Sequence, residues 1–168
     1  MSDFRYDPIA MLQTLNRHGV EYLVIGGFAA KLHGSSLITR DLDICYARDR
    51  ANLGRLAGAL REMGATVRGA PEGLPFRLDA RTLEKGDAFT FSTQLGALDI
   101  LGTPSGSGGY QELADEATEV DLDDVRIRVV SLDALLAMKR AAGRVKDLVA
   151  IEILEALRDE IEHGGGAT

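Results

Sequence analysis

Two aspartates, Asp41 and Asp43, stand two positions apart in a short apolar run that ends at Tyr46. Carboxylates are depleted from strands and are costly to bury unless a positive charge meets them. Residues two apart in a strand point to the same face, which would place these carboxylates about 6.6 Å apart along it. Their hard oxygens suit Mg²⁺, an ion that shares its remaining positions with waters and substrate phosphates. The spacing therefore indicates a divalent-cation site on a strand.

A turn without side chains precedes this pair. Residues 22–25 form an apolar run that ends at Gly26 and Gly27, and residues 28–33 are compatible with a helix. Glycine lets the backbone N–H groups at the start of a helix approach an anion closely. A phosphate site would then adjoin the cation site, and an ordinary strand-to-helix turn is the alternative explanation of the two glycines.

A third carboxylate, Asp99, is flanked by Leu and Ile in an apolar run that is also typical of a strand. Taken alone, this acid could be the partner of a nearby arginine such as Arg126 or Arg128. Asp121 and Asp123 repeat the same spacing, but no glycine turn precedes them. We therefore expect this second pair to be a solvated turn.

In order, these parts resemble the signature of the DNA polymerase β-like nucleotidyltransferase superfamily: an apolar strand, a glycine turn, a Thr-x-Asp-x-Asp segment and an acid on a later strand. The segment from Lys139 to Asp147 is similar to a Lys-x-x-Ala…Arg-x-Lys-Asp motif of small bacterial nucleotidyltransferase toxins of abortive-infection-type toxin–antitoxin systems. Two positions depart from the pattern. Many relatives carry Ser at the position of Gly27, and an Arg is expected where this chain has Leu37. The first departure affects a side-chain contact to phosphate, and the second affects a contact from the loop to the nucleotide or to the metal-binding acids.

The resemblance implies an enzyme that transfers a nucleoside monophosphate from an NTP to an acceptor and releases pyrophosphate. Asp41 and Asp43 would bind two Mg²⁺ ions, with Mn²⁺ as the alternative ion, and Asp99 would complete the site and accept a proton. Lys139 and Lys146 lie seven apart and would face the triphosphate from one side of a continuous helix; a solvated helix face interrupted by a glycine is the alternative. The expected catalytic residues are Asp41, Asp43, Asp99 and Lys139, the metal ligands are Asp41, Asp43 and Asp99, and the nucleotide-binding residues are Gly26, Gly27, Thr39, Lys139 and Lys146.

The acceptor is left open. RNA or tRNA, a protein and a small molecule are the classes that the resemblance implies, and the toxin-like branch also implies a cognate antitoxin as a partner. An antibiotic-type small-molecule nucleotidyltransferase is the alternative, which the net charge of −7 favours, whereas the C-terminal Lys-Arg motif favours the toxin-like branch. A non-catalytic regulator that binds nucleotide or a partner protein is the third hypothesis, and it would release no pyrophosphate.

Composition limits the protein class. The 168 residues are 45% hydrophobic and 27% charged, as expected for a soluble globular protein of one domain. The negative net charge argues against a surface that binds nucleic acid everywhere. One cysteine, Cys45, cannot form an internal disulfide, and neither a signal peptide nor a long apolar run is present. We therefore expect a cytoplasmic protein with no membrane partner and with Cys45 buried.

The expected fold is α/β (α+β): a small mixed-sheet nucleotidyltransferase core at residues 1–130, with flanking helices, and a C-terminal helical pair at residues 131–168 packed on it. Capping acids predict helices after Asp7 and after Asp49, and Ser131 predicts another. His18 and His33 are expected at the surface or at helix ends. Further helices are expected at residues 110–117 and 144–162, strands at 22–25, 76–78, 88–93 and 97–101, an edge strand at 125–130, a loop with at most a short strand at 66–75, a loop at 102–109 and a frayed tail at 164–168.

Overall fold

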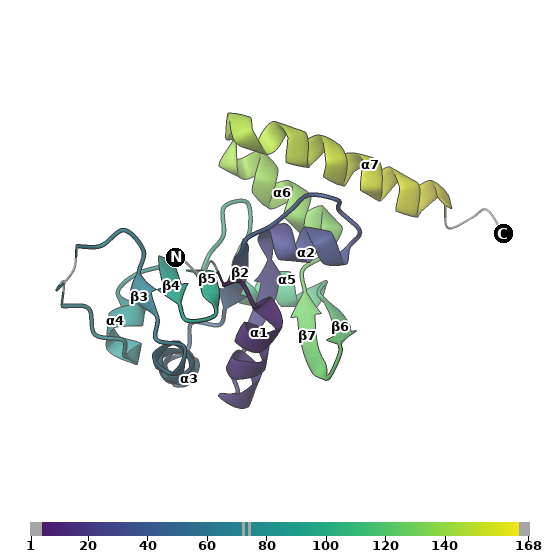
Figure 1. Cartoon of the computed structure of the whole chain (residues 1–168). Helices are drawn as coiled ribbons and strands as arrows, with labels where there is room; N and C mark the ends of the chain where they lie inside the picture. Colours follow the sequence, from purple (N-terminus) through teal and green to yellow (C-terminus); the bar gives the residue numbers. More distant parts are fainter. Residues whose placement is uncertain (1–4, 72, 74, 165–168) are drawn as a thin grey trace.

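Strand β2 (Asp41–Tyr46) carries the first two acids and lies at the centre of a mixed sheet (Figure 1). The structure is a computed structural model that describes residues 5–71, 73 and 75–164. Across these residues seven strands lie in the order β3-β4-β5-β2-β1-β7-β6. β2 runs antiparallel to β1 and parallel to β5, so both neighbours of β2 can deliver residues to the same end of the sheet. The other strands are β1 Tyr22–Ile25, β3 Thr66–Val67, β4 Ala88–Thr93, β5 Gly96–Leu101, β6 Thr118–Leu122 and β7 Val125–Val129.

Helices cover the sheet, and three of them begin at the predicted capping side chains. Asp7 accepts a hydrogen bond from the Ala10 N–H at 3.0 Å, and Asp49 and Ser131 make the equivalent bonds at 3.1 Å. Figure 1 shows α6 and α7 above α2, with α7 running beyond the sheet. The mixed α/β prediction is thus confirmed. The helices are α1 Pro8–Arg17, α2 Gly26–Leu32, α3 Arg50–Glu62, α4 Ala80–Glu84, α5 Tyr110–Asp115, α6 Leu132–Ala142 and α7 Leu148–Gly164, with a 3-10 turn η1 at Val145–Asp147.

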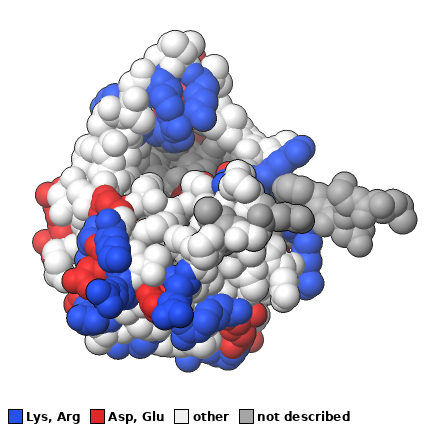
Figure 2. All heavy atoms as spheres, turned by 90° about the vertical axis from the view of Figure 1, so that its left-hand side faces the viewer, with Lys and Arg blue, Asp and Glu red and all other residues white. Residues whose placement is uncertain are grey.

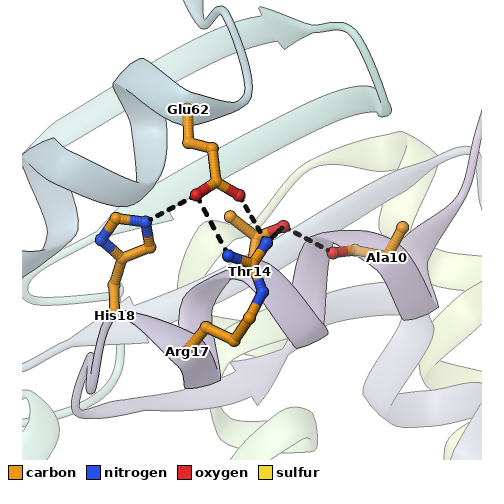
Figure 3. Close-up of polar contacts among 5 residues, drawn as sticks. All are labelled: Ala10, Thr14, Arg17, His18 and Glu62. Carbon is orange, nitrogen blue, oxygen red and sulfur yellow. Dashed lines mark hydrogen bonds and ion pairs between the residues drawn. The ribbon is translucent and has the colours of Figure 1, made fainter.

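An ion-pair network joins the ends of α1 and α3 (Figure 3). Arg17 and His18 both contact the Glu62 carboxylate, with His18 Nε2 at 3.1 Å from Oε1. Hydrogen bonds from Arg17 and then from His18 lower the pKa of Glu62 to about 2. His18 ends α1 as its C-cap, and His33 ends α2 in the same way, with its Nε2 at 2.8 Å from the Val130 carbonyl oxygen. Both histidines therefore lie at helix ends, as expected.

One apolar core fills the space between the sheet and the helices. It includes fully buried residues of β2 and β5 together with Leu132, Leu135 and Leu136 of α6 and Leu154 of α7. The C-terminal helices therefore share the core with the sheet. Cys45 is buried there as expected. No helix within the described chain has the length and apolar character that a membrane span requires.

Three element predictions are wrong. Residues 76–78 form no strand. The ring of Phe76 packs edge-on against those of Phe89 and Phe91, with centroids 6.2 and 6.1 Å away, and this contact accounts for the apolar residue at this position. β7 is not an edge strand, because β6, which was not predicted, pairs with it and forms the edge. Asp121 consequently lies at the end of β6 and not in a turn, while Asp123 occupies the hairpin turn with a positive φ of 53°.

Other differences are local. Helix α4 was not predicted, although Asp79 caps it by accepting a hydrogen bond from the Thr82 N–H at 2.8 Å. The predicted C-terminal helix begins at Leu148, after η1, and not at Arg144, because Gly143 ends α6 in the left-handed conformation at φ 62°. β3 is the short strand allowed within residues 66–75. Residues 165–168 of the predicted tail lie outside the described residues, whereas residue 164 is the end of α7.

Candidate active site

The three predicted acids come together from two adjacent strands. β2 and β5 run parallel with Asp43 directly opposite Asp99, and Asp41 lies two residues before Asp43 on the same face. Adjacent strands are about 4.8 Å apart, so this register places the Asp43 and Asp99 side chains next to each other. All three acids line a cavity of about 570 Å³ that lies between the sheet and the junction of α6 and α7. Figure 2 looks onto the hollow on this side, with Lys and Arg atoms gathered above it.

Gly26 makes room for the central acid. It has a φ of +68°, and a Cβ atom at this position would overlap the Asp43 carboxylate. β1 pairs Ile25 directly with Asp43, so the strand register brings the turn onto the acid. Gly27 is the second residue of α2, a helix whose N-terminus has no side-chain cap. Gly26 lines this cavity, and both predicted glycines line a smaller cavity that shares Asp41 and Asp43 with it.

Thr39 takes the space next to Gly27. A Cβ atom on Gly27 would lie 2.9 Å from Thr39 Oγ1, so Thr39 fills the volume that a serine in the turn would need. The Thr39 hydroxyl donates to the Asp41 carbonyl oxygen at 3.1 Å. Tyr6 Oη donates to the same oxygen at 3.2 Å. Burial, followed by the charges of Asp43 and Asp41, raises the pKa of Tyr6 to about 12. Two hydroxyls thus hold the start of β2.

Asp43 has the most perturbed carboxyl group of the site. Burial raises its pKa to about 7, and the charge and hydrogen bond of Asp99 and the charge of Asp41 act in the same direction. Lys139 opposes this rise by favouring the carboxylate. Two like charges about 4 Å apart at an effective dielectric near 20 repel by about 4 kcal/mol, which accounts for a retained proton. The group would ionise readily if a cation arrived.

The ion-pair partner of Asp99 is neither Arg126 nor Arg128. Arg126 binds Asp121 at 3.0 Å, and Arg128 donates to the Ala114 carbonyl oxygen at 2.7 Å. Asp99 Oδ1 accepts a hydrogen bond from Arg68 Nη2 at 2.9 Å. The two arginines suggested by the sequence are therefore wrong, but the alternative of an arginine partner for Asp99 is confirmed with Arg68, 31 positions away.

The basic wall of the cavity comes from the junction of α6 and α7. Lys139 Nζ and Arg144 Nε bind the two oxygens of Asp147 at 3.2 and 2.6 Å. Burial alone would raise the pKa of Asp147, but the hydrogen bonds from Arg144 and Lys139 outweigh it and hold this pKa below its ordinary value. Lys146 lines the same cavity. The helix break at residue 143 means that Lys139 and Lys146 share no helix face, yet the turn of η1 brings both to the cavity.

A smaller cavity of about 230 Å³ opens next to the first and shares Asp41, Asp43 and Lys139 with it. Its other walls are mainly apolar. Leu37, which stands where an Arg was expected, lines it together with Ile38, which is 88% exposed. The site thus has a charged compartment and an apolar one that meet at the acids. The remaining lining residues of the apolar compartment are Gly26, Gly27, Ala30, Thr39, Leu135, Ala150 and Leu154.

Solved nucleotidyltransferases have a similar architecture. The lincosamide antibiotic adenylyltransferase LnuA, bound to lincomycin, matches with a TM-score of 0.59 and 17% identity over 89% of this chain and 95% of its own. ANT(2″)-Ia in complex with adenylyl-2″-tobramycin matches with a TM-score of 0.53 and 16% identity, covering 90% of this chain and 92% of its own. The chain has the nucleotidyltransferase fold. A Thermotoga maritima protein assigned as a nucleotidyltransferase agrees, with a TM-score of 0.51, 16% identity and coverage of 92% and 90%. Neither a protein-family model nor a curated protein matches the sequence.

The donor set of this nucleotidyltransferase fold suits a hard divalent cation. The acids offer carboxylate oxygens only. Burial, and then the neighbouring Asp99 and Asp41, raise the pKa of Asp43 to about 7, and a bound cation would relieve this cost. Across residues 5–71, 73 and 75–164, no three His, Cys, Asp or Glu side chains are gathered closely enough to hold a metal ion as they stand. Asp41, Asp43 and Asp99 are thus a fitting set of donors whose side chains must converge further on binding.

Two residues of the site were missed in the sequence. Arg68 follows a two-residue strand in a Gly- and Pro-rich segment, and no local pattern distinguishes it from the other arginines. Tyr6 precedes the first helix and shows no sign of its bond to β2. Both contacts span more than 30 positions, 31 for Arg68 with Asp99 and 35 for Tyr6 with Asp41. Only the strand order could have revealed them.

Proposed function

We propose that the protein is a nucleotidyltransferase that transfers a nucleoside monophosphate from an NTP to an acceptor hydroxyl and releases pyrophosphate. The observation that carries this proposal is the register of β2 with β5, which sets Asp43 opposite Asp99 in one cavity with Lys139 on the other wall. The nucleotidyltransferase fold supports it.

Each residue has a distinct proposed part in the transfer. The acceptor oxygen attacks the α-phosphorus, the bond from this phosphorus to the β-phosphate oxygen breaks, and the acceptor proton passes to the Asp99 carboxylate. Gly26 and Gly27 offer backbone N–H groups at the uncapped start of α2 to the leaving phosphates. Lys139 faces the acids and the developing negative charge. Lys146, on the same wall, is proposed to contact the triphosphate.

A divalent cation is the proposed cofactor. Asp41, Asp43 and Asp99 would hold Mg²⁺, or Mn²⁺, which when bound supplies charge neutralisation for the phosphates. We propose two ions, because three carboxylates offer more oxygens than one Mg²⁺ that retains waters would use. Thr39 holds Asp41 in place through the Asp41 carbonyl oxygen and lines the apolar compartment, where we propose that its hydroxyl contacts the nucleotide.

A small hydroxylated molecule is the acceptor class that we propose first. LnuA carries lincomycin and ANT(2″)-Ia carries adenylyl-2″-tobramycin, so this fold accommodates small acceptors in those proteins. The apolar compartment with Leu37 and Ile38 would suit an uncharged part of such a molecule. The toxin-like branch, with RNA or protein as acceptor and a cognate antitoxin, is the alternative. It rests on the segment from Lys139 to Asp147, in which Asp147 forms ion pairs with Lys139 and Arg144 at the cavity.

Pyrophosphate release with each of the four NTPs, with Mg²⁺ or Mn²⁺ and a pool of small-molecule, RNA and protein acceptors, tests this function. We expect release with at least one combination, and a loss of about a hundredfold or more in Asp43→Asn and Asp99→Asn. Asp121→Asn is the matched control, because it removes an acid from an exposed ion pair outside the cavity. Mass spectrometry of the pools would identify the acceptor. Release that persists unchanged in both active-site variants would refute the assignment of the acids.

A further inference from the structure

Arg68 reaches the candidate active site from the edge of the sheet. It follows β3, and its backbone N–H donates to the Thr90 carbonyl oxygen of β4 at 2.9 Å. Its side chain crosses β4, where Nη2 donates to the Phe91 carbonyl oxygen at 2.7 Å, and the same nitrogen reaches Asp99 Oδ1 on β5 at 2.9 Å. The guanidinium is therefore anchored on one strand and bound to the acid of the next.

This ion pair differs from the surface pairs of the molecule. Exposed pairs such as Arg126 with Asp121, whose side chains are 69% and 66% exposed, contribute little to stability. The Arg68 and Asp99 side chains are 36% and 22% exposed, and Asp99 is in turn hydrogen-bonded to Asp43. A unit positive charge thus lies at the rim of a group of three acids, in contact with one of them.

We propose that Arg68 is a built-in counter-ion of Asp99 that competes with a divalent cation for this carboxylate. The inference rests on the proposed function, because it takes Asp99 to be a metal ligand. The competition follows from charge and space. Oδ1 of Asp99 can bind the guanidinium or a divalent cation. If both bound the same carboxylate, their positive charges would repel each other.

Arg68 is accordingly a positioning residue that acts through Asp99. Before a cation binds, it offsets the repulsion between Asp99 and Asp43 and holds the Asp99 side chain toward β4. When a cation binds, Arg68 must move away from Asp99 or share it. The partly exposed side chain of Arg68 has solvent to move into, and the bond to the Phe91 carbonyl oxygen can keep it on β4. Cation affinity is lowered as a result, so the site would fill fully only when NTP phosphates add their negative charge.

The experiment is a titration of the protein with Mn²⁺ in the absence of NTP. The loss of the EPR signal of free Mn²⁺ measures binding. In Arg68→Gln the charge is removed while the amide can still donate to the Phe91 carbonyl oxygen. We expect this variant to bind Mn²⁺ about tenfold more tightly than the wild type, because one positive charge near a divalent ion is gone. Arg126→Gln, which makes the same change in net charge on β7 in the other half of the sheet, should stay within about twofold of the wild type.

A second measurement reads the response of the wild-type protein itself, and a variant serves only to assign a resonance. Saturating Mg²⁺ should shift the side-chain ¹⁵Nε–H resonance of Arg68 in the wild type and leave that of Arg126 in place. Arg68→Lys, which keeps the charge and should fold, assigns the resonance by its disappearance. An Arg68 resonance that does not respond to a bound cation would overturn the inference.

The outcomes separate the two proposals. If Mn²⁺ binds the wild type and is lost in Asp43→Asn, but Arg68→Gln binds it no more tightly than Arg126→Gln, Arg68 is a structural residue only and the function stands. Weaker binding in Arg68→Gln would refute competition in the same way. If Mn²⁺ binds neither the wild type nor Arg68→Gln in a manner that depends on Asp43, the metal site is refuted, and both proposals fail with it.

Discussion

The substitution Asp43→Asn should stabilise the protein at neutral and higher pH while it removes a ligand of the proposed cation site. Asn has the shape of the protonated acid, and its amide can donate a hydrogen bond to Asp99 where the shared proton does so now. The pKa of Asp43 rises from 3.8 to about 7 on folding, because the partly buried carboxylate lies beside Asp99 and Asp41. At about 1.4 kcal/mol per pKa unit, this gap corresponds to at most about 4 kcal/mol of free energy of unfolding.

The sign of the pH dependence follows from the raised pKa. Between pH 4 and pH 7 the folded state keeps a proton that the unfolded state has lost, so acidification within this window stabilises the wild type. The stabilisation is fully present below the unfolded value of 3.8 and is lost as the pH rises through about 7. Asp43→Asn has no such proton. The two proteins should therefore be similar in stability near pH 4, and the variant should be the more stable near pH 8.

Urea unfolding followed by far-UV circular dichroism at several pH values measures the difference. The chain has no Trp, so secondary structure is a better signal than fluorescence. Adding Mg²⁺ at pH 8 should stabilise the wild type and leave Asp43→Asn unchanged, which separates cation binding from relief of repulsion. A stability difference that is constant from pH 4 to pH 8 would refute the crowded-acid interpretation, as would an equal response of both proteins to Mg²⁺.

Three further predictions use the same unfolding assay. Gly26→Ala should lower the free energy of unfolding by at least about 1–2 kcal/mol, because φ is +68° and the new Cβ overlaps a carboxylate. Its control, Gly54→Ala, places a Cβ in open space within α3 and should raise the free energy of unfolding by about 0.5–1 kcal/mol. Equal effects would contradict the geometry of the turn. Asp147→Asn should lower the free energy of unfolding by about 3 kcal/mol, because Lys139 and Arg144 lose a buried ion-pair partner. Its control, Asp121→Asn, should change the free energy of unfolding by less than about 0.5 kcal/mol. A loss in Asp147→Asn no larger than that of the control would show that these ion pairs are not structural. Below pH 4.5 the wild type should lose stability as the pH falls toward 2, since the lowered pKa of Glu62 stabilises the fold above that range, and a Glu62→Gln variant with the same acid profile would contradict this.

The local parts of the site could be predicted because local chemistry specifies them. The glycine turn, the alternation of Asp41 and Asp43 on β2 and the break at Gly143 each depend on a few adjacent residues. Asp99 was found through the resemblance, which implies a third acid between apolar residues on a later strand. Its proximity to Asp43 was an inference from the resemblance, and the register of β2 with β5 places the two side by side.

Other predictions failed where tertiary packing decides the outcome. The apolar character of Phe76 indicated a strand, but an aromatic cluster with two residues of β4 satisfies it without ladder hydrogen bonds. The alternation of β7 indicated an edge strand, and only the pairing with β6 shows that it lies inside the sheet. In both cases the hydrophobic pattern reported burial correctly, and burial alone does not specify the partner.

By itself, the sequence indicated the candidate side chains for the chemistry and determined most of the elements on which they lie, because capping, turn conformation and strand alternation act over a few residues. The strand order decided which charges meet. Arg68 binds Asp99 across β4, Lys139 and Arg144 meet on Asp147, and Lys146 reaches the acids over a helix break. These contacts depend on how distant segments pair and pack, and the electrostatic balance of the site is set by that arrangement.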